Sequence, residues 1–285
     1  MITVTDLTHI YNKGTPWETK ALERVSFRIE GGKCLGIVGE SGSGKSTLAH
    51  HLGGILPPTS GSVFIDGSDI YASQHGRHMK KVGLMFQCAA DQLFEESVFK
   101  EISFALRQRK TLTPREIEER VKALCRDLCP PLVDLMDRSP FELSEGEKSM
   151  VVVASILVSD PDILILDEPC AGLDPANRGE LIHHIETLHG KGKTLIILTN
   201  RFADLTHLFD RMIFLHEGTI IAQGPLQDLL VSEEIDPKVV HLLPPLNRML
   251  LHLRAKGIPI DPSLDTPSEI SEEIHRLLEK QRRDS

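Results

Sequence analysis

Apolar residues alternate with polar ones near the start of the chain. The period of two over residues 2–4 and 25–29 predicts half-buried strands. A continuous apolar run over 34–38 predicts a buried strand, and a shorter one over 63–65 predicts another. Between them we expect a helix that begins near Lys45.

From about residue 88 to 150 the pattern becomes helical. Thr113 is a candidate N-cap, Pro114 suits the first helical position, and Glu116 stands where a capping box places an acid. The apolar positions that follow at helical spacing are Ile117, Val121, Leu124 and Leu128. The apolar run over 150–158 fits either a buried strand or a helix.

Strand signals return over 163–166, 194–198 and 212–215, with a predicted helix over 175–189 between the first two. Strands that alternate with helices predict an α/β fold with a mainly parallel sheet covered on both faces. After about Gly224 the chain reads as a small helical tail broken by prolines.

Composition bounds the possible functions. The 285 residues suffice for one large α/β domain with a smaller appendage, and the net charge of −9 argues against broad nucleic-acid binding. No apolar run approaches the roughly 18–20 residues that span a bilayer, and the first residues do not read as a secretory signal. We expect a cytosolic protein without a nucleic-acid partner, so any membrane role should come through another chain.

Cysteines and paired histidines are further candidate reactive groups. The five cysteines form no CxxC pair, and we expect them to be small core residues in a reducing compartment. His50-His51 and His183-His184 fall on predicted helices, where adjacent side chains diverge. Packing or surface roles are therefore expected for them rather than a metal site.

A glycine-rich loop follows the strand expected over 34–38. It matches the pattern GxxxxGK[ST], in which glycines turn backbone N–H groups toward phosphates and the next helix adds positive potential. Lys45 should reach the terminal phosphates, and Ser46 should be a ligand of Mg²⁺. The residues predicted to bind the nucleotide here are Gly39, Glu40, Ser41, Gly42, Ser43, Gly44, Lys45, Ser46 and Thr47.

Two carboxylates end the apolar run over 163–166. Asp167 is expected to hold Mg²⁺, directly or through water, and Glu168 to polarise the water that attacks the γ-phosphate. An acidic pair after an apolar run is common at strand ends, so its weight comes from its place after the phosphate loop. Together the two motifs predict ATP and Mg²⁺ as ligands.

These motifs, in this order, resemble those of ABC ATPases over about residues 1–225. The resemblance implies a P-loop cassette with a RecA-like, mainly parallel core sheet, an N-terminal antiparallel β region and a helical subdomain at about 88–150. It implies that Tyr11 stacks on adenine. It also implies that Gln87 touches Mg²⁺ and couples hydrolysis to a membrane partner.

Further segments carry the same resemblance. Residues 143–147 (LSEGE) occupy the family's signature position, where the Ser144 hydroxyl and the N–H groups around Gly146 would face ATP held by an opposite subunit. Residues 171–174 (AGLD) resemble the D-loop.

A narrower resemblance is to ATPases of the energy-coupling factor group, which energise uptake of vitamins and of cobalt or nickel. The sequences DQLF at 91–94 and VF at 98–99 carry it, with the opening that contains Tyr11 and Thr15-Pro16. It implies a transmembrane coupling subunit, a separate substrate-binding membrane protein and a second ABC ATPase subunit. The protein would then sit at the cytoplasmic face of the membrane, and residues 226–285 would be a helical dimerisation tail.

The chain departs from the family at two positions. The usual LSGGQ is altered by Glu145 and Glu147, which bring negative charge near a polyanion unless both side chains point outward. Asn200 stands where the family has a histidine that contacts the γ-phosphate. A weakened charge-assisted hydrogen bond there corresponds to roughly 10- to 150-fold in rate. The predicted catalytic residues are Glu168, Asn200 and Gln87.

A homodimer would combine both departures in each composite site, whereas a heterodimer separates them, so we expect a heterodimer. The alternative to a transporter motor is a hydrolysis-poor nucleotide-binding partner that gates an active subunit. A soluble ABC protein of DNA repair or translation is less favoured, because the chain has neither two cassettes nor a long coiled-coil insertion. A simple P-loop kinase would lack the signature-like segment.

Overall fold

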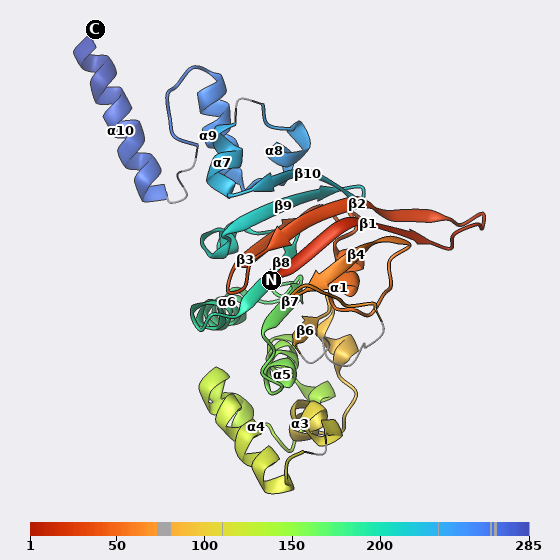
Figure 1. The fold of residues 1–285 in the computed structure, drawn as a ribbon. Coiled ribbons are helices and arrows are strands. Elements are labelled where there is room, and N and C mark those ends of the chain that lie inside the picture. Colours follow the sequence, from red (N-terminus) through yellow and green to blue (C-terminus); the bar gives the residue numbers. More distant parts are fainter. Residues whose placement is uncertain (73–80, 110, 233, 263, 265–266, 285) are drawn as a thin grey trace.

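In the part of the chain that the structure describes, two sheets are packed against helices (Figure 1). The computed structural model describes residues 1–72, 81–109, 111–232, 234–262, 264 and 267–284. No helix in this described part is both long enough and apolar enough to cross a bilayer.

The central sheet has the strand order β10-β9-β3-β8-β7-β6. Its strands are β3 (Cys34–Val38), β6 (Val82–Met85), β7 (Ile163–Asp167), β8 (Thr194–Thr199), β9 (Arg211–His216) and β10 (Thr219–Gly224). All neighbours pair in parallel except β9 and β10, which are antiparallel. Strands β3, β7 and β8 are buried along their whole length, which explains their unbroken apolar sequences.

The second sheet is antiparallel, with the order β2-β1-β4-β5. It comprises β1 (Ile2–Tyr11), β2 (Thr19–Ile29), β4 (Ser60–Ile65) and β5 (Ser68–Asp69). Its apolar face shares one core with helix α1 (Lys45–Leu52) and with one face of the central sheet. Helix α1 is therefore packed between the two sheets, and the loop that precedes it is held from both sides.

The other face of the central sheet is covered by α5 (Glu145–Leu157) and α6 (Pro175–Gly190). The apolar run over 150–158, which fitted a strand or a helix, lies mostly in α5. Helices α3 (Val98–Arg109) and α4 (Pro114–Leu128) extend this core to one end of the molecule. The capping box predicted for α4 is confirmed, since Thr113 Oγ1 accepts from the Glu116 N–H and the Glu116 carboxylate accepts from the Thr113 N–H. Short 3₁₀ turns lie at Ala89–Gln92, Pro130–Val133, Pro140–Glu142 and Ala203–Leu208.

The tail lies at the opposite end of the molecule from α3 and α4 (Figure 1). It consists of α7 (Leu226–Val231), α8 (Pro237–Leu242), α9 (Pro245–Ala255) and α10 (Pro267–Asp284). The prolines that break the pattern therefore begin helices, where a missing N–H costs nothing. One apolar cluster joins α7 and α8 to the central sheet, and another joins α9 to α10.

The strands expected from apolar runs are confirmed at β3, β7, β8 and β9. Two strands of the central sheet were not predicted. Strand β6 is only VGLM, and β10 reads TIIAQG with three of its residues polar or glycine. Both lie at the edges of the sheet, where burial is incomplete and the sequence signal is correspondingly weak.

Candidate functional site

The loop over 39–47 connects β3 to α1 and needs glycine for steric reasons. Gly44 has φ 101°, which favours glycine, and a Cβ at this position would lie 2.6 Å from the Ala21 carbonyl oxygen. A Cβ at Gly39 would lie 2.4 Å from the Leu215 carbonyl oxygen. The loop backbone is thus packed against neighbouring segments and has a defined shape.

Lys45 is buried at the start of α1, and its side chain turns back into this loop. Its Nζ donates to the carbonyl oxygens of Gly39 and Glu40 at 2.8 and 3.0 Å. The same Nζ lies 3.6 Å from Glu168 Oε1. The ammonium group therefore sits between the loop and the carboxylates at the end of β7.

Asp167 ends β7 and is buried beside Ser46. Burial raises the pKa of its carboxyl, while the hydrogen bond from Ser46 and the nearby charges of Lys45 and His50 oppose that rise. Asp167 Oδ1 is buried without a hydrogen-bond partner. A hydroxyl beside an unsatisfied carboxylate oxygen is an oxygen donor set of the kind that Mg²⁺ prefers, so these residues fit that ion.

Glu168 follows directly, with a left-handed backbone at φ 50° that turns its side chain off the strand. Its Oε2 accepts from the Thr199 hydroxyl at 3.0 Å, and the Asn200 backbone N–H also donates to its carboxylate. Burial raises the pKa of Glu168, and Lys45, Thr199 and the Asn200 N–H partly counter this. A buried carboxylate with a raised pKa is suited to accept a proton.

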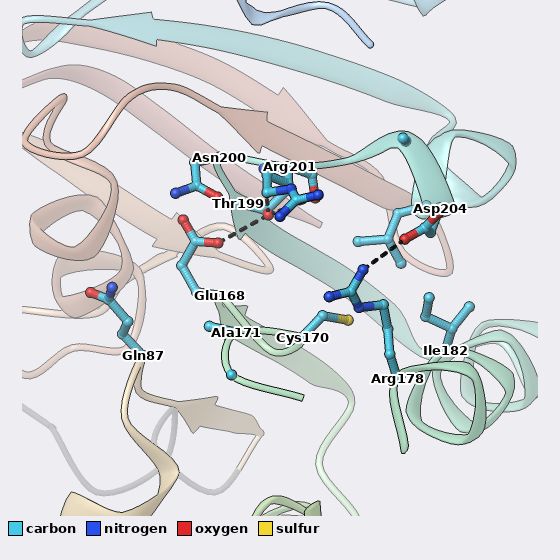
Figure 2. A pocket seen from close by; sticks show the side chains of 13 residues that line it. Gln87, Glu168, Cys170, Ala171, Arg178, Ile182, Thr199, Asn200, Arg201 and Asp204 are labelled. Atoms are coloured by element: carbon cyan, nitrogen blue, oxygen red, sulfur yellow. Dashed lines mark hydrogen bonds and ion pairs between the residues drawn. The ribbon is translucent and has the colours of Figure 1, made fainter. Parts of the chain in front are cut away.

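Glu168 faces a cavity of about 420 Å³ that also holds Gln87 and Asn200 (Figure 2). Gln87 follows β6 and Asn200 follows β8. Because both strands run parallel to β7, these residues lie near its C-terminal end, next to Glu168. The structure therefore brings together the three residues that were predicted to be catalytic.

Tyr11 ends β1 beside helix α1. Its hydroxyl lies 3.2 Å from Thr47 Oγ1, and its ring packs edge-on against His9 with centroids 4.4 Å apart. The side chain is partly exposed next to the loop.

Ser144 and Gly146, at the start of α5, do not line the cavity that holds Glu168. Gly146 packs against α6, where a Cβ would lie 2.6 Å from Asn177 Cγ. The side chain of Glu147 does not point outward but turns back onto Ser144. Its Oε2 accepts from the Ser144 N–H at 2.8 Å and from the Ser144 hydroxyl at 2.7 Å, forming a capping box.

Glu145 does point outward, and it pairs with Lys148 at 2.7 Å. The signal for the box was in the sequence as the Ser-x-x-Glu pattern. It lacks the proline that made the box at Thr113 easy to see.

Three other residues of the site were missed by sequence reasoning. Thr199, which holds Glu168, could have been found because it ends β8 next to β7. Arg178 and Asp204 line the far end of the cavity, where α6 meets the 3₁₀ turn at Ala203–Leu208, and no sequence spacing predicts that contact.

The histidine pairs behave as packing and surface residues. His51 is fully buried and its Nδ1 lies 2.5 Å from the Leu56 carbonyl oxygen, while His183 on α6 is largely exposed. Within the described residues, no group of three His, Cys, Asp or Glu side chains suits a metal ion.

Comparison with known proteins identifies the family. The family model described as ABC transporter matches residues 22–171. The energy-coupling factor transporter ATP-binding protein EcfA2 of Acetivibrio thermocellus is 39% identical over 280 residues, which cover 98% of this chain and 99% of that protein. The protein of the same name from Clostridium acetobutylicum is 37% identical over 285 residues, 99% of each chain. The chain belongs to the ABC transporter ATP-binding family.

Solved structures agree with this assignment. The structure of cbiO1 from Clostridium perfringens, described as part of the ABC transporter complex cbiONQ, matches with a TM-score of 0.71 and 31% identity over 89% of this chain and 98% of that one. A dimeric ATP-binding cassette bound to ADP and phosphate matches with a TM-score of 0.70 and 25% identity over 79% of this chain and 98% of that one. The predicted fold class is confirmed, and this ABC ATPase is a transport-coupled, ATP-binding enzyme.

Proposed function

We propose that this ABC ATPase energises an uptake transporter of the energy-coupling factor type, with a vitamin or a transition-metal ion as cargo. The similarity to the EcfA2 proteins supports this, because it runs through the tail as well as the nucleotide-binding part, over 98–99% of this chain. The required partners are a transmembrane coupling subunit, a separate substrate-binding membrane protein and a second ABC ATPase. The protein would be held at the cytoplasmic face of the membrane by these partners.

The observation that carries the proposed chemistry is the convergence of Lys45, Asp167 and Glu168 at the carboxyl ends of β3 and β7. Lys45 and the loop over 39–47 bind the phosphates of ATP, and Tyr11 stacks on its adenine. Ser46, Asp167 and Gln87 hold Mg²⁺, which neutralises phosphate charge when it is bound.

In this scheme Glu168 accepts a proton from the attacking water, and Thr199 keeps the carboxylate aimed. Asn200 hydrogen-bonds the γ-phosphate through its amide. Ser144 and Gly146 contact ATP that is held by the other ATPase subunit.

The domain arrangement follows from the same proposal. Residues 1–225 form the cassette, with the helical subdomain at about 88–150 facing the membrane partner, and 226–285 form a dimerisation tail. A heterodimer is favoured because each composite site then carries either Asn200 or the altered signature, but not both.

A second candidate is a nucleotide-binding partner that hydrolyses ATP poorly and gates an active subunit. Asn200 favours it, because an amide beside Glu168 can donate a hydrogen bond to the γ-phosphate but cannot carry a proton. The two candidates differ in whether the site built on this chain's own Lys45 and Glu168 turns over.

The test is co-purification of this chain with neighbouring membrane and ATPase subunits, followed by MgATP binding and turnover with and without the second ATPase. Glu168→Gln in the assembled complex separates the candidates. A large loss of turnover supports the motor, and an unchanged rate supports the gating partner.

Lys45→Ala tests the binding site itself, with Lys193→Ala as control. Lys193 is also a largely buried lysine paired with an acid, Asp160, but lies away from the loop. We expect Lys45→Ala to weaken MgATP binding at least tenfold, because a charge-assisted contact is lost. Equal nucleotide affinity in Lys45→Ala and the wild type would refute the proposed site.

A further inference from the structure

The cavity that Glu168 faces extends well beyond the catalytic residues. Its volume of about 420 Å³ far exceeds the roughly 10–15 Å³ that a single water requires. No residue of the loop over 39–47 lines it. The cavity therefore lies beside the predicted place of the ATP phosphates and on the far side of Glu168 from the loop.

The far end of the cavity carries a guanidinium group with poor partners. Arg178 Nε is buried without a hydrogen-bond partner. Arg178 Nη1 lies 3.4 Å from Asp204 Oδ2, and Nη2 lies 3.5 Å from the Leu173 carbonyl oxygen. Charge-assisted hydrogen bonds are normally about 2.7–2.9 Å long, so Arg178 is only loosely paired.

The charges around the cavity are arranged along its length (Figure 2). The Glu168 carboxylate stands at one end, and Arg178 at the other, with Arg201 and the amides of Gln87 and Asn200 among the lining residues. Asp204 is more exposed than Arg178, with 59% of its side chain accessible against 31%. An anion that entered the cavity could therefore replace Asp204 as the partner of Arg178, while the Asp204 side chain turned to solvent.

We propose that this cavity binds the inorganic phosphate released by hydrolysis, with the Arg178 guanidinium as its principal partner. The inference rests on the proposed role of Glu168 at the site of water attack. Phosphate formed there is repelled by the ADP diphosphate on the side of the loop. Glu168, which has accepted the proton of the attacking water, no longer carries the charge that would oppose movement of the phosphate past it. The open direction is the cavity, and Arg178 supplies the planar pair of N–H groups that suits a phosphate.

Binding of radiolabelled inorganic phosphate to the full-length chain saturated with MgADP tests this by equilibrium dialysis. Arg178→Met should weaken phosphate binding by roughly tenfold or more, because a charged hydrogen-bond donor is lost. Asp204→Asn should strengthen it several-fold, because the competing carboxylate is removed. A merely structural ion pair would not give these opposite signs.

Arg107→Met is the matched control. Arg107 is a partly exposed arginine paired with one carboxylate, Glu95, and it lies on α3 outside the cavity. Its loss should leave phosphate affinity unchanged. Arg178→Lys, which keeps the charge, should give an intermediate phosphate affinity. It replaces Arg178→Met as the test variant if Arg178→Met does not fold.

MgADP affinity is measured in every variant. Failure of the wild type to bind MgADP would refute the proposed function rather than this inference. With MgADP bound, absent phosphate binding in the wild type, equal affinity in Arg178→Met, or weakening by Asp204→Asn would each overturn the inference.

Discussion

At Ser144 one carboxylate oxygen of Glu147 accepts both the hydroxyl and the backbone N–H. These two hydrogen bonds lower the pKa of Glu147, so the group is charged at neutral pH. The carboxylate satisfies the start of α5 and repels any phosphate that approaches it. A single side chain therefore stabilises the helix and weakens its use as a phosphate contact.

Glu147→Gln removes this charge but leaves an amide oxygen able to accept from Ser144. In the complex with the second ATPase, we expect several-fold faster turnover or tighter MgATP binding at the site that Ser144 completes. Steady-state ATPase assays of the complex measure this.

The control is Glu116→Gln, in the equivalent box of α4. It removes the same interaction from a helix that lies away from Glu168, so it should lower stability slightly without changing turnover. If both variants left turnover unchanged, the Glu147 carboxylate would act only as a helix cap and would not affect the phosphate contact of Ser144.

His51 is a second residue whose burial has a measurable consequence. Its pKa is lowered to about 4, chiefly by burial and also by the neighbouring His9 and His50. Burial also lowers the pKa of His9, whose ring centroid lies 4.7 Å from that of His51. His51 belongs to helix α1, and His9 packs against it from β1.

This predicts a loss of stability in mild acid. Between the unfolded pKa near 6.5 and the folded value near 4, the unfolded chain binds more protons. The His51 contribution is therefore complete above about pH 6.5 and is lost progressively toward pH 4, by roughly 2 kcal/mol at pH 5. Urea unfolding at pH 7.5 and 5.0 measures it.

His51→Gln should flatten this pH dependence, whereas His183→Gln, at an exposed histidine, should leave it unchanged. An unaltered slope in His51→Gln would show that other groups cause the acid sensitivity.

Among the elements, α8 contacts both halves of the candidate site. Val239 on α8 belongs to the apolar cluster that contains Val38 and Phe202. Val38 directly precedes the loop over 39–47, and Phe202 follows Asn200 by two residues. From the same helix, His241 Nε2 lies 3.6 Å from Glu40 Oε1. The tail thus supports the backbone on which the loop and Asn200 are carried.

Val239→Ala should therefore lower turnover several-fold in addition to its cost of roughly 1–3 kcal/mol in stability. Leu253→Ala is the control, because Leu253 packs in the separate cluster between α9 and α10. It should destabilise the tail without changing the turnover of the folded protein. ATPase assays and thermal unfolding of both variants distinguish the outcomes, and equal effects on turnover would argue against a specific role of α8.

The elements also show what the sequence can predict. Strands β3, β7 and β8 were predictable because burial on both faces requires unbroken apolar runs, and α4 because its cap satisfies backbone donors locally. The approach of Lys45 to the end of β7 was predictable as well. The loop that precedes Lys45 follows β3, and parallel strands have their C-terminal ends on the same side of a sheet.

Contacts between distant segments were not predictable in the same way. The loose pairing of Arg178 with Asp204 depends on how α6 meets the turn after β8. The direction of the Glu147 side chain depended on recognising a second capping box.

At the scale of the whole molecule, the structure separates the parts that act on nucleotide from those proposed to contact other chains. The helices α3 and α4 extend from one end, and the tail from the other (Figure 1). The central sheet lies between them, and Asp167 and Glu168 at the C-terminal end of β7 meet Lys45 of α1 there. Motion at this site can therefore reach either end through packed helices rather than through loops.

The turn between β9 and β10 also touches the loop over 39–47. The Gly218 N–H donates to the Ser43 carbonyl oxygen at 3.0 Å, and the Gly218 carbonyl accepts from the Glu23 N–H at 2.9 Å. The β9–β10 turn, which is itself bonded to β2, therefore holds the backbone of the loop in place. Such a preorganised loop loses little conformational entropy on binding, and the same nine residues placed in another protein would not have that advantage.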